Sequence, residues 1–280
     1  MKSQKLIMIM SKVKAFPAMP TTATKLLPLL DDPDVSFTEI EDIIRYDPGL
    51  TANILKLTNS AYFGIPVKVH SVHQAMSLLG WKRLLQLVMT LCMSSIMKKP
   101  IPGYDLPRGE LWRHSIAVSI AAEYIVKALN ITDADEVFTA GLLHDVGKLI
   151  LGGFVKKDLE FIEGMVAKGF SFDVAENIIL GTDHAEVGAK ILRQWSFPED
   201  LVNAVGWHHN PENCKNRCML SDIVHLANNL GQAIGAGRSI KESHSELSHT
   251  VIDNLGFKPV DLEEIASQTV KGVNKLAEVL

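Results

Sequence analysis

The feature that most constrains this chain is a hydrophobic period of about 3.6 residues that recurs in almost every segment. Strand-like alternation bounded by turn residues is scarce. With 47% hydrophobic residues among 280, the chain has enough apolar surface to bury a substantial core. The pattern therefore predicts an all-α, multi-helix fold.

Several helix starts are marked by local capping signals. Ser36–Glu39 and Ser71–Gln74 have the capping-box pattern, in which a side-chain oxygen and an acid or amide three residues later satisfy free backbone donors. Asp47 precedes a proline that suits the first helical position. These signals predict helices beginning near Phe37, Pro48 and Val72.

The second half carries acidic versions of the same signal. Asp133 with Glu136 and Asp183 with Glu186 predict further helix starts, and Pro198 opens a helix that should stop before Asn210-Pro211.

The segment 98–107 is rich in proline and glycine and is the best linker candidate. We therefore expect an N-terminal helical half at residues 1–105, packed on a helical core at 106–230 and followed by a helical tail at 231–280.

Charge and cysteine content narrow the class of protein. A formal charge of −4 with 21% charged residues gives no strong field for nucleic acid or an anionic membrane, so neither is expected as a partner. Three sparse cysteines describe no disulfide framework, which favours a reducing, cytoplasmic setting. Cys214 and Cys218 could share a helical face as metal ligands, but no second cysteine pair completes such a site.

No export or membrane segment is expected. The apolar run Leu6–Met10 is too short for the core of a signal peptide. The most apolar long window, Met76–Met97, is interrupted by Lys82 and Arg83, so it is interpreted as a core helix.

The most informative motif is the neighbouring pair His144 and Asp145. An imidazole nitrogen and a carboxylate oxygen suit divalent metals such as iron, manganese or zinc. Lys148 follows within one helical turn and projects from the same side, where a cation beside a metal could hold phosphate oxygens. Taken alone, the pair could equally be a solvated helix end.

Further imidazoles and one carboxylate occur on other predicted helices, and together they could converge on one interior site, where helical folds build metal centres. The candidate ligands are His114, His144, Asp145, His184, His208, His209 and Asp222. The side chains of His208 and His209 would diverge on a regular helix, so two ligands there need two metals or a distorted helix end. One ligand plus a phosphate-facing histidine is the alternative. Singly, each residue is more often a surface or core residue than a ligand.

The order of these residues resembles the HD superfamily of metal-dependent phosphohydrolases, and the surrounding sequence is similar to its HDOD branch. The phrases that carry the resemblance are Leu111–Ser115, Gly141–Asp145, Asp183–Gly188, Trp207–His209, Asp47–Thr51 and Asn59–Gly64. The similarity runs from about Ala15 to Asn229. It implies an HD/HDOD helical fold.

The resemblance also implies a site holding one or two divalent ions of iron, manganese or zinc. In HD enzymes such ions activate water against a phosphoester, which would give Asp145 and Lys148 catalytic roles. Enzymes that hydrolyse cyclic dinucleotides carry Gly-Tyr-Pro after the paired histidines, whereas this chain has Asn210-Pro211-Glu212. Glu110, four residues before His114, is a further candidate ligand that an ordinary helix start also explains.

Three functions follow as hypotheses. The first is a bacterial HDOD signalling module with a metal site, acting through signalling proteins of unknown identity. The second is a metal-dependent phosphohydrolase acting on a phosphorylated small molecule or nucleotide. The third is a non-catalytic interaction scaffold.

Overall fold

The structure is a computed structural model that describes residues 2–17, 19, 21–30, 36–45, 47–131, 136–236 and 247–277. The described ranges contain no β-strand, only an isolated bridge between Ile101 and Leu106. The predicted all-α class is therefore confirmed.

The chain forms two compact units, residues 1–17 with 97–270 and residues 18–96 with 271–280. The smaller unit contains α2 (Thr21–Leu26), η1 (Leu27–Leu30), α3 (Phe37–Arg45), α4 (Pro48–Thr58), α5 (Val72–Leu79) and α6 (Trp81–Met97). Its core is aliphatic, because residues such as Ile44, Ile54 and Leu84 are fully buried.

The larger unit opens with α1 (Lys2–Lys14) and resumes after α6. It contains η2 (Pro102–Tyr104), α7 (Glu110–Ala128), α8 (Glu136–Leu143), α9 (Lys148–Lys157), α10 (Leu159–Val166), α11 (Phe172–Leu180), α12 (His184–Gln194), α13 (Glu199–Gly206), η3 (Pro211–Asn213), α14 (Met219–Ala233), α15 (His249–Leu255) and most of α16 (Pro259–Ala277).

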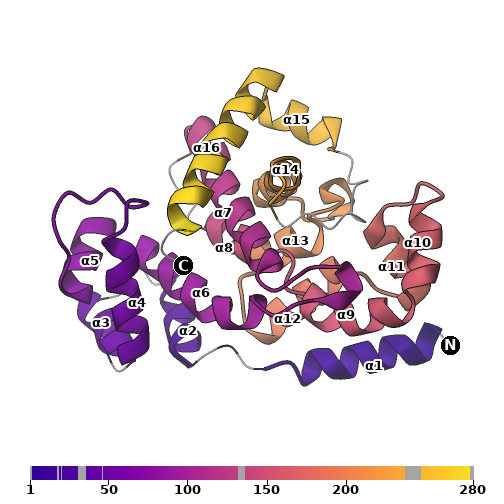
Figure 1. Cartoon of the computed structure of the whole chain (residues 1–280), viewed down its shortest axis with the longest axis horizontal. Helices are drawn as coiled ribbons and strands as arrows, with labels where there is room; N and C mark the ends of the chain where they lie inside the picture. Colours follow the sequence, from indigo (N-terminus) through magenta and orange to yellow (C-terminus); the bar gives the residue numbers. More distant parts are fainter. Residues whose placement is uncertain are drawn as a thin grey trace. The chain divides into compact units, whose positions relative to one another are not determined.

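Three helices form the centre of the larger unit. In Figure 1, α7, α8 and α14 lie side by side. Val118 and Ala122 of α7, Val137 of α8, and Ile223 and Leu226 of α14 are buried together. The small residues of α7 allow this close approach: a Cβ at Gly141 of α8 would lie 2.8 Å from the Cα of Ser119.

The predicted helix starts at Phe37, Pro48 and Val72 are confirmed, and the capping bonds are present. Asp47 Oδ1 accepts a hydrogen bond from the backbone N–H of Leu50 at 3.0 Å, and Ser71 Oγ accepts one from Gln74 at 3.1 Å. Asp183 caps α12 in the same way, accepting from Glu186 at 2.8 Å. The start signal at Asp133 lies outside the described residues, although α8 begins at Glu136.

One stretch, Glu136–Lys157, is long and apolar enough to cross a membrane by length and composition. However, 78% of its apolar window is buried inside the fold. It includes α8, α9 and the turn between them, so it forms part of the protein core. Such a stretch is weak evidence for a membrane span.

Candidate metal centre

Six of the predicted ligands lie together inside the larger unit. His114 comes from α7, His144 and Asp145 from the turn between α8 and α9, His184 from the start of α12, and His208 and His209 from the segment after α13. We call these six residues the His/Asp cluster. Each of them except His209, which is partly exposed, is buried.

A glycine allows two of these elements to meet. A Cβ at Gly147 would lie 1.9 Å from the carbonyl oxygen of His184. Only glycine lets the turn that carries Asp145 pass so close to the start of α12. This approach brings the ligands of two elements together.

The Asp145 carboxylate lies at the middle of the cluster. Four imidazole Nε2 atoms face its oxygens: His144 at 3.3 Å and His114 at 3.6 Å from Oδ2, and His184 at 3.4 Å and His208 at 3.8 Å from Oδ1. Lys148 Nζ lies 2.8 Å from Oδ2, so the two residues predicted to act in catalysis form a buried ion pair.

Backbone carbonyls determine which nitrogen of two imidazoles faces the cluster. His144 Nδ1 donates to the carbonyl of Gly141 at 2.8 Å, and His208 Nδ1 donates to that of Val205 at 2.7 Å. Because a carbonyl only accepts, each Nδ1 carries the proton and each neutral ring presents an Nε2 lone pair to the interior. This arrangement suits metal ligation.

Three buried atoms of the cluster have no hydrogen-bond partner: His144 Nε2, His208 Nε2 and Asp145 Oδ1. Leaving a buried polar atom unpaired costs about 1–3 kcal/mol, and an unpaired charge costs more. A divalent cation would satisfy all three atoms, because imidazole nitrogen and carboxylate oxygen are its usual ligands. The residues present therefore fit a metal ion.

His184 is oriented by a buried carboxylate. Glu176 Oε2 accepts hydrogen bonds from the Nδ1 of His184 at 2.7 Å and from its backbone N–H at 2.9 Å. The hydroxyl of Tyr104 donates to Glu176 Oε1. A carboxylate behind a histidine fixes its tautomer and strengthens it as a ligand, so His184 Nε2 faces Asp145.

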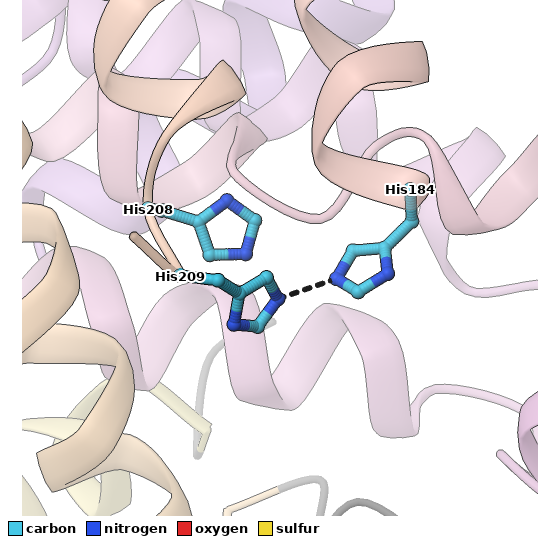
Figure 2. A group of neighbouring side chains, drawn as sticks. All are labelled: His184, His208 and His209. Carbon is cyan, nitrogen blue, oxygen red and sulfur yellow. Dashed lines mark hydrogen bonds between the residues drawn. The ribbon is translucent and has the colours of Figure 1, made fainter. Parts of the chain in front are cut away.

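The turn after α13 explains how both neighbouring histidines contribute. The helix ends at Gly206, and the rings of His208 and His209 lie with centroids 4.0 Å apart. Figure 2 shows both rings beside His184, with His209 Nε2 lying 2.7 Å from His184 Nε2. Both histidines thus lie beyond the end of the regular helix, in a turn that brings their rings together.

Burial and neighbouring charges shift the pKa values of several residues in the cluster. Burial, reinforced by His144, holds the pKa of His208 well below its usual value and lowers the pKa of His114 to about 4. Burial would raise the pKa of Asp145, but His144 and Lys148 outweigh it and hold that pKa well below its usual value. His114 and His208 are thus neutral and the Asp145 carboxylate is ionised, which are the states that bind metal.

His184 differs from the other histidines. Burial lowers its pKa, but the charge and hydrogen bond of Glu176 act in the opposite direction and raise it to about 9.

Asp222 does not lie with the cluster. Its two carboxylate oxygens accept from Nε and a terminal nitrogen of Arg217, both at 2.9 Å. It belongs to neither of the two ligand groups found among the described residues, which are His184, His208 and His209, and His114, His144 and Asp145. A guanidinium thus compensates this carboxylate, and its role as a metal ligand stays a prediction.

Three other weaker candidates also lie apart from these groups. Glu110 is partly exposed and has Arg113 3.6 Å away. Cys214 and Cys218 belong to neither group.

Sequence reasoning missed three buried polar residues around the cluster. Glu176 lies four residues after Phe172 and four before Leu180, on the apolar face of α11. A charged residue at a core position of a helix is unusual, and that could have identified Glu176 from the sequence. Asn228 lies on the buried face of α14, and its Oδ1 is 3.0 Å from His114 Nε2. His225 Nδ1 donates to the carbonyl of His208 at 2.8 Å, which holds the turn that presents both histidines.

The fold and the site define an all-helical protein with a buried histidine and aspartate cluster of the kind that holds a divalent metal. The sequence profile of the HDOD domain matches residues 16–211, which is more than half of the chain. The chain therefore belongs to the HDOD domain family, as its motifs predict.

Solved structures agree with this assignment. An HDOD domain protein of unknown function from Geobacter sulfurreducens is 23% identical and superposes with a TM-score of 0.79, covering 99% of both chains. A protein from Shewanella amazonensis SB2B, provisionally named a phosphohydrolase, is 26% identical with a TM-score of 0.74, covering 97% of this chain and 98% of the other.

Among curated proteins, an uncharacterized protein of Treponema pallidum is 25% identical over 207 residues, which are 72% of this chain. The match spans only 39% of that relative's length.

Proposed function

We propose that this chain is a bacterial cytoplasmic regulatory module whose His/Asp cluster binds one or two divalent transition metals, iron, manganese or zinc. The observation that carries the proposal is the convergence of three buried, unpartnered atoms, His144 Nε2, Asp145 Oδ1 and His208 Nε2. A buried site with unmet donors and acceptors costs stability unless something fills it.

Two ligand groups support one or two ions. In each group, the candidate ligand atoms all lie within 4.8 Å of one another. Asp145 faces both groups, since its Oδ1 lies 3.4 Å from His184 Nε2 and its Oδ2 lies 3.3 Å from His144 Nε2. Asp145 is thus the residue whose loss should remove the metal.

The regulatory role follows from where the ligands come from. They are supplied by α7, the α8–α9 turn, α12 and the segment after α13. A metal held by all four elements stabilises one packing of these helices, because an ion that binds only the folded arrangement shifts the equilibrium toward it. Signalling proteins would then distinguish the metal-loaded packing from the metal-free one.

A metal-dependent phosphohydrolase is the second candidate, favoured by the position of Lys148. When bound, a divalent metal supplies an activated water for attack on a phosphoester. Lys148 would hold the phosphate oxygens of a phosphorylated small molecule or nucleotide. In the structure its ammonium is buried and donates to Asp145 at 2.8 Å, and an ammonium has further N–H donors for phosphate oxygens. The provisional name of the Shewanella amazonensis protein points the same way.

The test is the metal content of protein purified without chelators or a metal-affinity tag. We expect about one or two equivalents in the native chain and none in Asp145→Asn. Asp200→Asn, which changes an exposed aspartate at the start of α13, is the matched control and should retain the metal. Equal metal content in all three proteins would overturn the proposal.

A second experiment separates the two functions. Metal-loaded protein is offered a panel of phosphomonoesters and nucleotides, with Lys148→Met as the comparison. The hydrolase function would be established if the native protein turned over a substrate and Lys148→Met kept the metal but lost that turnover. Metal-dependent binding of a partner without turnover would support the regulatory module.

A further inference from the structure

A second candidate site lies in the larger unit, in an apolar groove of about 410 Å³ between α1 and α9. These two helices pack against each other within that unit, as Figure 1 shows. The walls of the groove include Met8 and Phe16 from the N-terminal segment, and Leu149 and Phe154 from α9. No residue of the His/Asp cluster lines it.

Helix α1 attaches to the unit by one face and presents other residues to the groove. Ile9 and Val13 are buried and attach the helix to the unit. Met8, one position earlier, is 52% exposed and faces the groove together with Lys12, one helical turn further on. An exposed apolar surface in a groove of this kind is typical of a binding site.

The floor of the groove is open down to the helix backbone. A Cβ at Gly153 would meet no atom within 4 Å. At the preceding residue, Gly152, a Cβ would lie 2.3 Å from a methyl group of Ile101, so that side of α9 is filled by the fold. The open space at Gly153 therefore belongs to the groove and does not extend to the side of α9 that carries Gly152.

The charge at the groove has one sign. Lys12 and Lys157 line it and are exposed, and the described lining residues include no aspartate or glutamate. Nearby Lys5, by contrast, is neutralised by Asp158 at 2.7 Å. An apolar floor with two ammonium groups favours a ligand that has an apolar body and a negative charge.

We propose that this groove binds a single-chain amphiphile with a carboxylate head group, that is, an aliphatic carboxylate of medium length. Its alkyl chain would lie over Gly153 between Phe16, Leu149 and Phe154, and its carboxylate would pair with Lys12 or Lys157. The size fits: Leu149 and Lys157 are about 12 Å apart along a helix at 1.5 Å per residue. The volume lies within the range of about 300–1,000 Å³ that is usual for small-molecule sites.

The experiment is a titration of the full chain with decanoate below its micelle concentration. Calorimetry measures the affinity, and the labelled methyl group of Met8 reports the location by NMR. We expect saturable binding at one site with a shift of the Met8 signal. The same titration on chelator-treated protein should give binding too, so a failed metal proposal would not affect this result.

Two pairs of variants test the site. Gly153→Leu fills the floor and should weaken decanoate binding at least tenfold, while Gly164→Leu, at an open glycine on α10, should not. Lys12→Glu combined with Lys157→Glu should also weaken binding at least tenfold, whereas Lys156→Glu, exposed on the same helix but outside the groove, should not.

The head group is tested with a cationic amphiphile of the same chain length, decyltrimethylammonium, which should bind at least tenfold more weakly than decanoate. Equal affinity for the two amphiphiles would overturn the proposal that the groove prefers a negatively charged head group. Equal decanoate binding by Gly153→Leu and Gly164→Leu would overturn the site itself.

Discussion

Replacing Glu176 by glutamine tests how the cluster is held together. The Glu176 carboxylate is fully buried and accepts from the imidazole and backbone N–H of His184 and from the hydroxyl of Tyr104. Glutamine has nearly the same shape. Its oxygen can keep the two bonds to His184, and its amide can donate to the oxygen of Tyr104. The change therefore removes the charge while most of the packing stays.

The expected loss is larger for metal binding than for folding. Removing a carboxylate behind a ligating histidine typically costs about 10–100-fold in metal affinity, equivalent to about 1.4–2.7 kcal/mol. We expect that loss for Glu176→Gln. Above the folded pKa of His184, where the imidazole is neutral, the free energy of unfolding should fall by only about 1 kcal/mol, since three hydrogen-bond positions are retained.

The charge of Glu176 also gives metal-free protein a characteristic pH dependence. The folded pKa of His184 is about 9, above its ordinary value of 6.5. A group whose pKa rises on folding stabilises the protein fully below its unfolded pKa and loses that contribution as pH rises through the folded pKa. Chelated native protein should therefore lose stability between about pH 6.5 and pH 9, and Glu176→Gln should lose much less.

The assay combines metal titration in a competing chelator with denaturant unfolding at several pH values. Glu160→Gln, an exposed glutamate on the neighbouring α10, is the control and should match the native chain in both. If Glu176→Gln bound metal as tightly as Glu160→Gln, the argument that Glu176 orients a ligand would be refuted.

Three further predictions concern single residues. Gly147→Ala should lower the free energy of unfolding by about 3 kcal/mol or more, since the new Cβ would lie 1.9 Å from the His184 carbonyl oxygen; thermal melting that matches Gly153→Ala would contradict this. Asp222→Asn should keep the full metal content, measured by mass spectrometry, but lose about 1–3 kcal/mol of stability through its pair with Arg217. Loss of the metal would instead return Asp222 to the ligand set. Burial raises the pKa of the Cys92 thiol to about 11, so its alkylation, followed in a variant with the other two cysteines changed to serine, should be slow at pH 8 and accelerate about tenfold per pH unit; a rate equal to that of a free thiol would show that the site is open.

The helix starts were predictable because their causes are local. The bond from Leu50 N–H to Asp47, and the one from Glu186 N–H to Asp183, each join residues three positions apart. Such contacts depend on the sequence within one turn and little on the rest of the fold. The ends of helices are less local, and the end of α13 at Gly206 is what brings His208 and His209 to the same site.

The residue types of the site could be predicted from the sequence, but the side chains that each of them contacts could be predicted only in part. Asp222 has the chemistry of a metal ligand, but residue type alone does not predict that Arg217, five residues earlier, pairs with it in the fold. Asn228, six residues later, faces His114. Because asparagine carries no charge, it did not stand out in the sequence as a candidate. Which of two polar residues on one helix faces a distant histidine depends on the rotation of that helix in the packed core, and the local sequence pattern does not reveal that rotation.

The position of α9 links the two proposed sites. The helix begins at Lys148, which pairs with Asp145, and Leu149 and Ile150 immediately after it line the groove. The two sites are coupled if ligands of the groove and of the cluster favour different placements of this helix. In that case the metal changes the affinity for decanoate, and decanoate changes the affinity for the metal by the same factor. Equal decanoate affinities in metal-loaded and chelated protein would mean that α9 is rigid and the two sites are independent. A difference would make the groove an input through which a small amphiphile controls the packing that we propose signalling proteins distinguish.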